Sequence, residues 1–328
     1  MPLIDPEDVR FFSGLSHPEL AAGITSHLDI PLEKTYCSRF SNDNLFIQLG
    51  ASVRGRSVYI IQSLTAPVSD RLLELLMMLD IARGAGAKEV HAVIPYFSYA
   101  RSDKKDEPRI SITARLVADL LQTAGATHVM TMTLHSPQVH GFFSLPTDPL
   151  TSRPLFTHHF HERGFCQEDT IVVAPDIGHA KSAARFATSL GLQIAAAEKK
   201  RLSDHIVEIN QDSVERQVKG YHRALIYDDE IATGGTVIEL CRCLTESGVK
   251  EIATICTHGL FTDNALQRLA SIPEIKEIVT TDTVPIPLDN RPDYLTVISV
   301  AGVFGEAILR NYRRQSIGDL FAYWEEKI

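Results

Sequence analysis

The sequence predicts an α/β protein made of two similar halves, each a mainly parallel sheet flanked by helices. Three observations support this class. Apolar segments of strand length alternate with amphipathic segments of helical spacing, which is typical of parallel sheets covered by helices. The alternation repeats after about residue 150, and a length of 328 residues suits two domains. We therefore predict a first half over residues 1–150 and a second half over residues 151–307.

The first half shows three apolar strands with helices between them. The apolar run 58–62 predicts a buried strand, and apolar residues at helical spacing predict a helix over 70–83. The pattern continues with a strand over 90–95, a helix over 111–124 and a strand over 128–134.

The second half repeats this order after a segment, residues 145–154, whose Pro, Thr and Ser content makes it the best candidate for the boundary between the two halves. Its strands alternate with helices in the same way, so the same kind of parallel sheet is expected. The predicted elements are strands over 170–175, 192–197, 222–227 and 251–258, and helices over 179–190 and 235–247.

Composition excludes several classes of protein. Apolar residues make up 44% and charged residues 22%, so the chain can bury a core and is not disordered. The net charge of −9 argues against a nucleic-acid partner or a membrane partner. No apolar run is long enough to span a membrane, and the N-terminus lacks the pattern of a secretory signal. The five cysteines form no CxxC pair, so we expect reduced cysteines in a cytoplasmic protein.

The segment from Ala224 to Val237 is the most informative in the chain. It runs from an apolar strand through two acids to a Thr-Gly-Gly-Thr turn that opens a helix. Glycines let the backbone approach a ligand closely, and the N–H groups of a helix N-terminus favour an anion. Asp228 and Asp229 can accept hydrogen bonds from two neighbouring sugar hydroxyls. The segment predicts a sugar-phosphate site; the alternative is a tight strand–helix turn capped by Thr.

This segment resembles the 5-phosphoribosyl 1-pyrophosphate (PRPP) loop of proteins with the type I phosphoribosyltransferase fold. That fold includes transferases and the enzymes that make PRPP. Other segments, from about Phe12 to Phe321, are similar to the ribose-phosphate pyrophosphokinase (PRPP synthetase) family. They are residues 40–44, 53–63, 66–76, 93–109, 133–143, 282–286 and 315–321. The resemblance implies a phosphoribosyltransferase-like fold for each half.

The resemblance also implies a reaction. Pyrophosphate would pass from ATP to the 1-hydroxyl of ribose 5-phosphate, giving PRPP and AMP, with Mg²⁺ as the cofactor. The family is commonly a homo-oligomer built from dimers, in some cases a hexamer. The sequence has no Walker A motif, so ATP has to be bound by another device. By the same resemblance, the last helix, residues 308–328, packs back on the first half.

In the first half, the resemblance assigns a set of residues to ATP. Phe40 would stack on the adenine, with Asn42 and Asn44 reading its edge, although the family has acids at these two positions. Arg101 and Lys104 would grip the phosphates through charge-assisted hydrogen bonds. A glutamine of the family is replaced by serine at the position after Arg101. The full set is Phe40, Asn42, Asn44, Arg101, Ser102, Lys104 and His135.

The resemblance assigns Mg²⁺ to His135 and Asp176, which both follow predicted strands, at the edge where ligands of open parallel sheets bind. Because Mg²⁺ prefers oxygen, Asp176 is the expected direct ligand, and His135 is open to a phosphate contact instead. Catalysis is assigned to Lys199, Arg201 and His135. The two cations would neutralise charge on the transferred group and on the leaving AMP. Residues 202–219 lack strong periodicity, which predicts a mobile flap.

The resemblance assigns ribose 5-phosphate to the loop of the second half. The family's third acid in this loop is replaced by Ala232, so a related enzyme acting on a different sugar phosphate stays open. The assigned residues are Asp228, Asp229, Ala232, Thr233, Gly234, Gly235 and Thr236.

Other readings stay open beside this one. The amides at positions 42 and 44 would also fit a non-catalytic regulatory subunit of such an enzyme, and the loop alone would fit a transferase that uses PRPP and a base. The histidine-rich segment 157–162 is predicted to start a surface helix rather than to bind a metal, because the run supplies no second shell.

Overall fold

The structure, a computed structural model, divides the chain into two compact units, which are described separately. Unit 1 consists of Met1–Thr151, Thr283–Pro285 and Ser299–Ile328, and unit 2 consists of Ser152–Asp282 and Ile286–Ile298. Each unit is built around its own six-stranded sheet. The residues described are 3–165, 167–201 and 207–321.

The sheet of unit 1 has the strand order β2-β1-β5-β6-β7-β8, and every neighbouring pair is parallel. Its central strands are buried on both faces, as in other parallel sheets covered by helices. The three strands predicted in this half are present as β5, β6 and β7. The bounds are β1 (Val9–Ser13), β2 (Leu32–Glu33), β5 (Ser57–Ile61), β6 (Glu89–Ile94), β7 (His128–Met132) and β8 (Thr147–Leu150).

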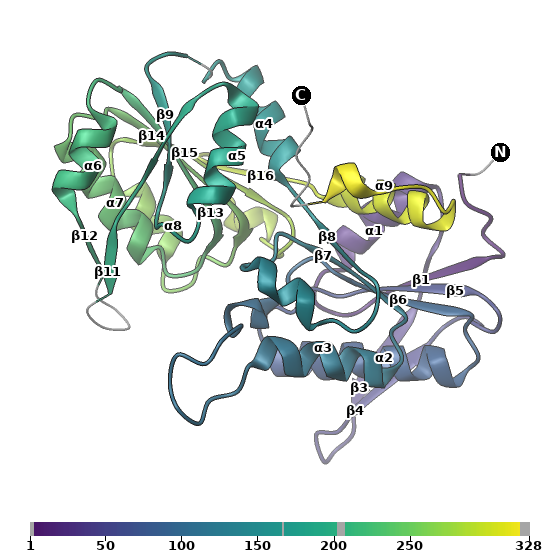
Figure 1. The fold of residues 1–328 in the computed structure, drawn as a ribbon. Coiled ribbons are helices and arrows are strands. Elements are labelled where there is room, and N and C mark those ends of the chain that lie inside the picture. The colour runs from purple at the N-terminus through teal and green to yellow at the C-terminus, as the bar shows by residue number, and fades with distance from the viewer. Residues whose placement is uncertain (1–2, 166, 202–206, 322–328) are drawn as a thin grey trace. The chain divides into compact units, whose positions relative to one another are not determined.

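Helices cover both faces of this sheet (Figure 1). On one face lie α2 (Val68–Gly84) and α3 (Thr113–Ala124), which confirm the two helices predicted in this half. On the other face lie α1 (Pro18–Leu28) and α9 (Ala301–Tyr312). The short 3-10 helices are η1 (Ser98–Arg101), η2 (Pro137–Phe142) and η4 (Gly318–Leu320).

The contact between α1 and α9 depends on small residues. Gly305 is buried, and a Cβ atom there would lie 3.0 Å from Cγ of His27 and still closer to its Cδ2. Gly302, one turn earlier, is exposed, and a Cβ atom there would lie 4.0 Å from the His27 ring. The last helix of the described residues differs in its bounds from the prediction of 308–328, of which residues 322–328 lie outside the described residues. It begins at Ala301 and ends at Tyr312, just before Arg314 takes a left-handed conformation with φ of 56°.

The segment predicted as the boundary between the halves contains a strand. All four residues of β8 are buried, and β8 pairs with β7 in parallel. Pro149 can occupy this strand because β8 lies at the edge of the sheet, where one side of the strand needs no partner. The two units divide between Thr151 and Ser152, inside the segment 145–154 predicted as the boundary, although residues 147–150 of that segment form a strand.

A row of side chains crosses the sheet of unit 1 in register. Phe11, Tyr59, His91 and His128 are paired on successive strands. The rings of Phe11 and Tyr59 stack at 4.8 Å, and those of Tyr59 and His91 at 4.3 Å. The Nδ1 atoms of His91 and His128 lie 3.0 Å apart, and Nε2 of His128 is 2.7 Å from a carboxylate oxygen of Asp148. The row places the ionisable rings of His91 and His128 in the buried core.

Unit 2 repeats the topology of unit 1. Its strand order is β10-β9-β13-β14-β15-β16, again with every pair parallel, and the four strands predicted in this half are present. The strand predicted over 222–227 continues to Ile231, because its pairing with the next strand extends to Gly259. The bounds are β9 (Thr170–Ala174), β10 (Gln193–Ala196), β13 (Arg223–Ile231), β14 (Glu251–Gly259), β15 (Ile275–Thr281) and β16 (Leu295–Ile298).

Both faces of this sheet are apolar, and successive strand residues serve opposite faces. Val172 and Leu225 pack in the cluster of α4 and α5, whereas Val173 and Ile226 pack in the cluster of α6 and α7. The predicted helices over 179–190 and 235–247 are present as α5 and α7. The bounds are α4 (Arg153–Glu162), α5 (Ala180–Leu190), α6 (Gln211–Val218), α7 (Gly235–Glu246), α8 (Ala265–Ala270) and η3 (Leu288–Asn290).

An antiparallel hairpin follows the second strand in each unit (Figure 1). In unit 1 it is formed by β3 (Thr35–Arg39) and β4 (Leu45–Leu49), and in unit 2 by β11 (Lys199–Arg201) and β12 (Val207–Ile209). Within the segment 202–219, where the sequence predicts a mobile flap, the structure has β12 and α6, and residues 202–206 lie outside the described residues. Asn210 caps α6 by accepting a hydrogen bond from the Ser213 N–H, a capping pattern that the sequence analysis overlooked.

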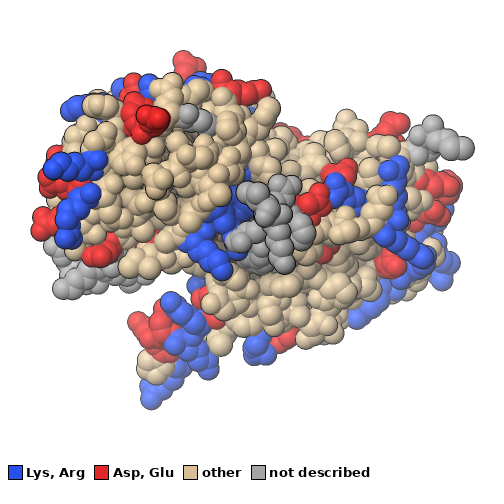
Figure 2. Space-filling view, turned by 45° about the horizontal axis from the view of Figure 1, so that its top comes forward, with Lys and Arg blue, Asp and Glu red and all other residues tan. Residues whose placement is uncertain are grey.

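The visible surface carries both positive and negative side chains, as the composition of the sequence predicts (Figure 2). Lys and Arg side chains lie interspersed with Asp and Glu side chains on the visible face (Figure 2). Within the described parts of the chain, no helix has the length and apolar character needed to cross a membrane. Among the described cysteines, Cys37, Cys241, Cys243 and Cys256 are free thiols.

Candidate functional site

The carboxyl ends of β9 and β13 bring polar side chains together in unit 2. Asp176 lies two residues beyond β9, and His179 directly precedes α5. Asp228 and Asp229 lie near the end of the neighbouring strand β13. Because β9 and β13 are parallel, their carboxyl ends meet at one edge of the sheet, where ligands of such sheets bind. We call Asp176, Asp228 and Asp229 the acid cluster.

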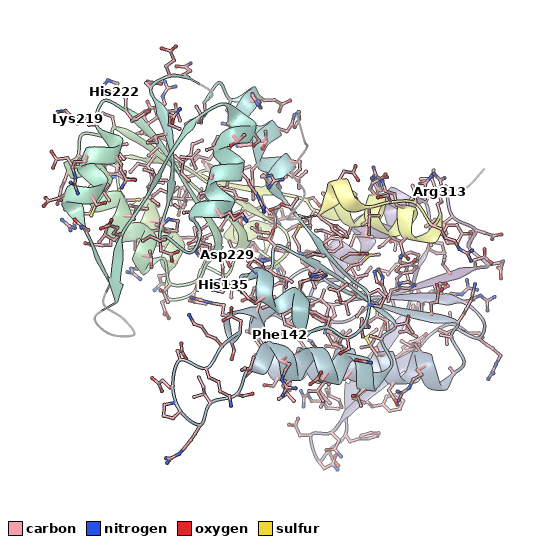
Figure 3. The ribbon with its side chains drawn as sticks, in the orientation of Figure 1. His135, Phe142, Lys219, His222, Asp229 and Arg313 are labelled. Carbon is pink, nitrogen blue, oxygen red and sulfur yellow. The ribbon has the colours of Figure 1, made fainter. Side chains whose placement is uncertain are left out.

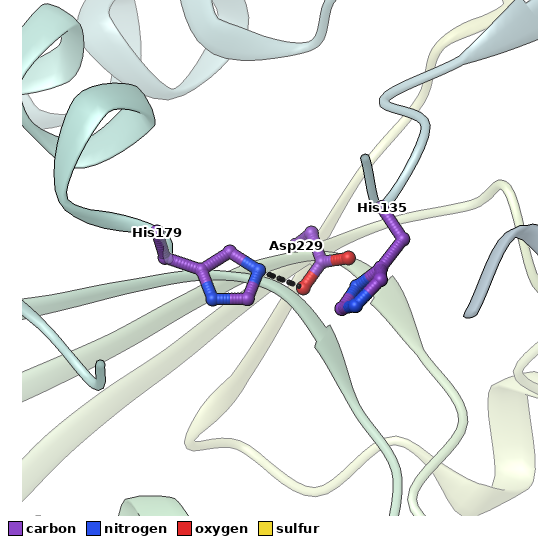
Figure 4. A group of neighbouring side chains, drawn as sticks. All are labelled: His135, His179 and Asp229. Atoms are coloured by element: carbon purple, nitrogen blue, oxygen red, sulfur yellow. Dashed lines mark ion pairs between the residues drawn. The ribbon is translucent and has the colours of Figure 1, made fainter. Parts of the chain in front are cut away.

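His179 bridges the acid cluster. Its Nδ1 lies 2.9 Å from Oδ1 of Asp176. Its Nε2 lies 2.9 Å from Oδ1 of Asp229, which is the ion pair drawn in Figure 4. Both ring nitrogens lie within ion-pair distance of carboxylate oxygens. Burial opposes a positive charge on the ring, but hydrogen bonds to Asp176 and Asp229 raise the pKa of His179 to about 11. From the sequence, His179 was expected only as the start of a helix. An Asp-x-x-His spacing at a strand end was the available signal.

The two acids of β13 lie in an environment that disfavours a second negative charge. Asp229 is buried, and its N–H donates a hydrogen bond to Oδ1 of Asp228 at 2.9 Å. Burial and the nearby charge of Asp229 raise the pKa of Asp228. Donors such as vicinal sugar hydroxyls would stabilise both carboxylates, which is the chemistry predicted for this pair.

The glycine-rich loop follows directly. Gly234 is buried and left-handed, with φ of 74°, and it precedes the first residue of α7 without a side-chain cap. This conformation suits glycine, and the start of α7 is a helix N-terminus of the kind that attracts phosphate. Arg268 of α8 donates a hydrogen bond to the Thr233 carbonyl at 3.1 Å and so holds the loop in place. Thr233 is exposed, and Ala232, Gly235 and Thr236 are half-buried around it.

The predicted adenine residues of unit 1 lie at the tip of the β3–β4 hairpin. The Phe40 ring is 57% exposed and meets the ring of Phe46 edge to face at 5.7 Å, so it offers an open face for stacking. Asn42 and Asn44 are exposed, and the Asn44 N–H donates to Oδ1 of Asn42 at 3.3 Å. Arg39 bonds Oδ1 of Asp43 at 2.9 Å and so braces this tip.

The predicted phosphate-binding residues of unit 1 follow β6. The buried rings of Tyr96 and Phe97 anchor the chain before η1, which ends at the exposed Arg101. The Ser102 hydroxyl donates to the Ser111 carbonyl at 3.2 Å and accepts from the Thr113 N–H at 3.3 Å. Ser102 therefore closes the base of a loop on which Lys104 is exposed.

His135 lies on the loop after β7, half-buried between the buried residues Leu134 and Ser136. Thr133, two residues earlier, has φ of 42°, which is an outlier for a β-branched residue. Strain of this kind is concentrated at functional sites. The strained backbone at Thr133 therefore supports a functional role for the loop that carries His135.

The predicted catalytic cations lie on β11. Lys199 is paired with Ile209 and Arg201 with Val207 in the antiparallel hairpin. Their side chains lie outside what the structure describes, so only their backbone positions are known.

The chemistry of the acid cluster fits Mg²⁺. Its three carboxylates offer oxygen atoms, the ligands that Mg²⁺ prefers, and they converge on one edge of the sheet. Of the two residues predicted to hold the metal, Asp176 belongs to unit 2 and His135 to unit 1.

The histidines of α4 do not converge. His158 pairs with Glu162 at 3.2 Å, His159 with Glu277 at 3.2 Å, and His161 meets the Ser189 carbonyl at 3.4 Å. The segment 157–162 forms the second half of α4, not its start as predicted, because the helix already begins at Arg153 after Ser152.

Comparisons with known proteins agree with this geometry. Residues 9–125 match the N-terminal domain of ribose phosphate pyrophosphokinase, and residues 212–322 match the phosphoribosyl synthetase-associated domain. A relative from Streptomyces coelicolor is 49% identical over 96% of this chain and 98% of its own. The ribose-phosphate pyrophosphokinase of Caldanaerobacter subterraneus is 41% identical over 95% of this chain and 98% of its own. The crystal structure of phosphoribosylpyrophosphate synthetase from Mycobacterium smegmatis has a TM-score of 0.86 at 36% identity, covering 94% of this chain and 99% of that one.

Proposed function

The chain belongs to the ribose-phosphate pyrophosphokinase family, and from this premise we propose how its residues carry out pyrophosphoryl transfer. The donor is ATP, the acceptor is the 1-hydroxyl of ribose 5-phosphate, and the products are PRPP and AMP. The hydroxyl oxygen forms a bond to the β-phosphorus of ATP, and the bond from that phosphorus to the α,β-bridging oxygen breaks. The hydroxyl proton is released, and AMP leaves with the bridging oxygen.

The observation that carries the proposal is the continuous acid-and-glycine segment at the end of β13. Asp228 and Asp229 accept hydrogen bonds from the two ribose hydroxyls. The 5-phosphate binds to the N–H groups that begin α7, which Gly234 leaves accessible through its left-handed conformation. One segment therefore recognises both ends of the same sugar phosphate, with Ala232, Thr233, Gly235 and Thr236 completing the loop.

ATP is recognised by residues of unit 1. The exposed ring of Phe40 stacks on adenine, and the amides of Asn42 and Asn44 contact its edge. Arg101 and Lys104 bind the phosphates, with Ser102 shaping the loop that carries them. His135 contributes to the phosphate end of the same nucleotide.

Catalysis rests on positioning and on charge neutralisation, because phosphoryl chemistry leaves little covalent work for the protein. Lys199 and Arg201 neutralise charge on the transferred group and on AMP as it leaves. Asp176 holds Mg²⁺, with His135 as the second proposed contact. When bound, the metal offsets the negative charge of the polyphosphate.

The experiment is to incubate the full chain with ATP, Mg²⁺ and ribose 5-phosphate and to follow nucleotides and sugar phosphates by chromatography. AMP and PRPP should appear in equal amounts. ADP in place of AMP, or no AMP at all, would contradict pyrophosphoryl transfer. Replacing ribose 5-phosphate by other sugar phosphates tests the acceptor at Ala232.

A second candidate function is a non-catalytic regulatory subunit, which the amides Asn42 and Asn44 would allow. It predicts binding of ATP without turnover, and altered activity of a catalytic partner on mixing. We also propose that the chain is cytoplasmic and that it forms a homo-oligomer built from dimers. Sedimentation of the purified chain tests the oligomeric state.

A further inference from the structure

Arg39 lies directly before the residues proposed to bind adenine, yet the proposed reaction gives it no role. It is the last residue of β3, so its side chain lies at the base of the tip that carries Phe40. The side chain is 39% exposed and pairs with two acids that lie far apart in the sequence, Asp43 and Asp70. A role for Arg39 rests on the proposed function, because it assumes that Phe40 stacks on the adenine of ATP.

The tip of the β3–β4 hairpin is a closed turn with one strained position. The Phe40 N–H donates a hydrogen bond to the Asn44 carbonyl at 2.9 Å, and the Asp43 N–H donates to the Phe40 carbonyl at 2.9 Å. Asp43 has a left-handed backbone with φ of 68°. Glycine adopts this conformation freely, whereas a residue with a Cβ atom needs support from its surroundings. The turn that presents Phe40 and Asn44 therefore depends on what stabilises Asp43.

Arg39 supplies this support. Its Nη1 donates to the carbonyl oxygen of Asp43 at 2.9 Å and to Oδ1 of the same residue at 2.9 Å. One nitrogen thus holds both the backbone and the side chain of Asp43, and bonds between charged groups are stronger than neutral ones. The contact stabilises the left-handed conformation and, with it, the turn.

The same guanidinium ties the tip to a helix. Nη2 of Arg39 donates to Oδ2 of Asp70 at 2.6 Å, and Asp70 lies in the first turn of α2. This helix packs against β4 over the core of unit 1, so it is a fixed reference for the hairpin. A single exposed ion pair contributes little, because water screens it. A planar guanidinium that bonds three oxygen atoms on two elements also restrains direction, which a lysine cannot do.

We propose that Arg39 is a positioning residue that holds the adenine-binding tip in its binding conformation before ATP arrives. Ordering a loop during binding lowers the affinity for the ligand, and a loop that is already ordered avoids this loss. Arg39 acts through Phe40 and Asn44 and does not touch the nucleotide. Its loss should therefore weaken the binding of the adenine part of ATP and leave the chemical step unchanged at saturation.

The test compares two ligands of the full chain by calorimetry, with Mg²⁺ present and ribose 5-phosphate absent. ATP carries adenine and phosphates, whereas tripolyphosphate carries phosphates alone. Arg39→Ala should raise the Kd of ATP about fivefold and leave the Kd of tripolyphosphate unchanged. Arg39→Lys should recover only part of the loss, because an ammonium group does not reproduce the bonds to Asp43 and Asp70 together. With saturating substrates, kcat of Arg39→Ala should stay within about twofold of the original value.

A second substitution tests the cause of the effect. Asp43→Gly places at the left-handed position the residue that needs no support. In this background, Arg39→Ala should raise the Kd of ATP by only about twofold. An undiminished fivefold loss would show that Arg39 does not act through the turn and would overturn the proposal.

Two other arginines of unit 1 serve as controls. Arg83, in the last turn of α2, bonds a carboxylate oxygen of Asp80 at 2.7 Å and the Thr123 carbonyl at 2.6 Å, the same kinds of acceptor that Arg39 has. Arg313 bonds the Leu3 carbonyl at 3.2 Å and follows α9, far from the β3–β4 hairpin (Figures 1 and 3). Arg83→Ala and Arg313→Ala should leave the Kd of ATP unchanged. A fivefold loss in either control would show a general effect of surface charge and would overturn the proposal.

Phe40→Ala separates this inference from the proposed function. If Phe40→Ala weakens ATP binding and Arg39→Ala does not, the role of Arg39 alone fails. If Phe40→Ala binds ATP as before, the proposed adenine site fails and the role of Arg39 fails with it. Weaker binding of tripolyphosphate by Arg39→Ala would mean that Arg39 contacts the phosphates directly, which also overturns the positioning role.

Discussion

Acid should destabilise the protein through His91, and replacing this residue should remove that part of the pH dependence. His91 is 3% exposed, stacks on Tyr59, and faces Nδ1 of His128 at 3.0 Å. Burial, followed by the charge of His128, lowers the pKa of His91 from 6.5 to about 4, against the opposing effect of Glu89. In the unfolded chain the ring regains its ordinary pKa.

The sign and the size follow from proton linkage. Between pH 6.5 and 4, the unfolded chain binds a proton at this ring that the folded chain does not. The free energy of unfolding therefore falls as the pH falls through this range and is unaffected by His91 above it. A pKa difference of one unit is worth about 1.4 kcal/mol, so the loss at pH 4 is about 3 kcal/mol.

The assay is urea denaturation of the full chain in steps from about pH 7.5 to pH 4. His91→Phe keeps an aromatic ring against Tyr59 but cannot bind a proton. The variant should be less stable near neutral pH, because His128 loses a hydrogen-bond partner. Its stability should then fall by about 3 kcal/mol less than that of the unmodified chain. His222→Phe, at an exposed histidine, should keep the original slope.

Parallel curves for His91→Phe and the unmodified chain would refute the reasoning. They would mean that the ring binds protons equally well in the folded and unfolded states. Burial beside Tyr59 and His128 would then not prevent His91 from carrying a positive charge.

Three other predictions concern packing and catalysis. Gly305→Ala should lower the free energy of unfolding by about 1–3 kcal/mol because its methyl group meets His27. Gly302→Ala, in the same helix, should be neutral or stabilising. Equal effects of the two variants in urea denaturation would exclude a steric origin. Lys199→Ala should lower kcat by tenfold or more with little change in the Kd of ATP, and a loss confined to KM would contradict its proposed role in the transition state. Asp228→Ala should weaken ribose 5-phosphate binding by about tenfold in calorimetry, and unchanged affinity would show that this acid does not hold the sugar.

Periodicity predicted the central elements of both sheets because each carries a long, regular pattern. Strands β5, β6, β7, β9 and β14 are short apolar runs, and the helices between them have apolar residues at helical spacing. The edge strand β10 was also predicted, but other short or edge elements gave no such signal. In β8, turn-forming residues obscured a fully buried edge strand, because edge pairing tolerates proline. The start of α9 was missed because the expected bounds came from the family resemblance and not from the spacing of apolar residues over 301–312.

The sequence by itself determined the α/β class, the repeated order of elements and the acid-and-glycine segment after a strand, because each depends on residues close together in the chain. Only the tertiary structure decided that His179 bridges Asp176 and Asp229, which are more than 50 residues apart in sequence. It likewise decided that His91 and His128 share one buried row, since this contact depends on the register of neighbouring strands. Periodicity shows which face a residue occupies, but only strand pairing shows which residues it meets there.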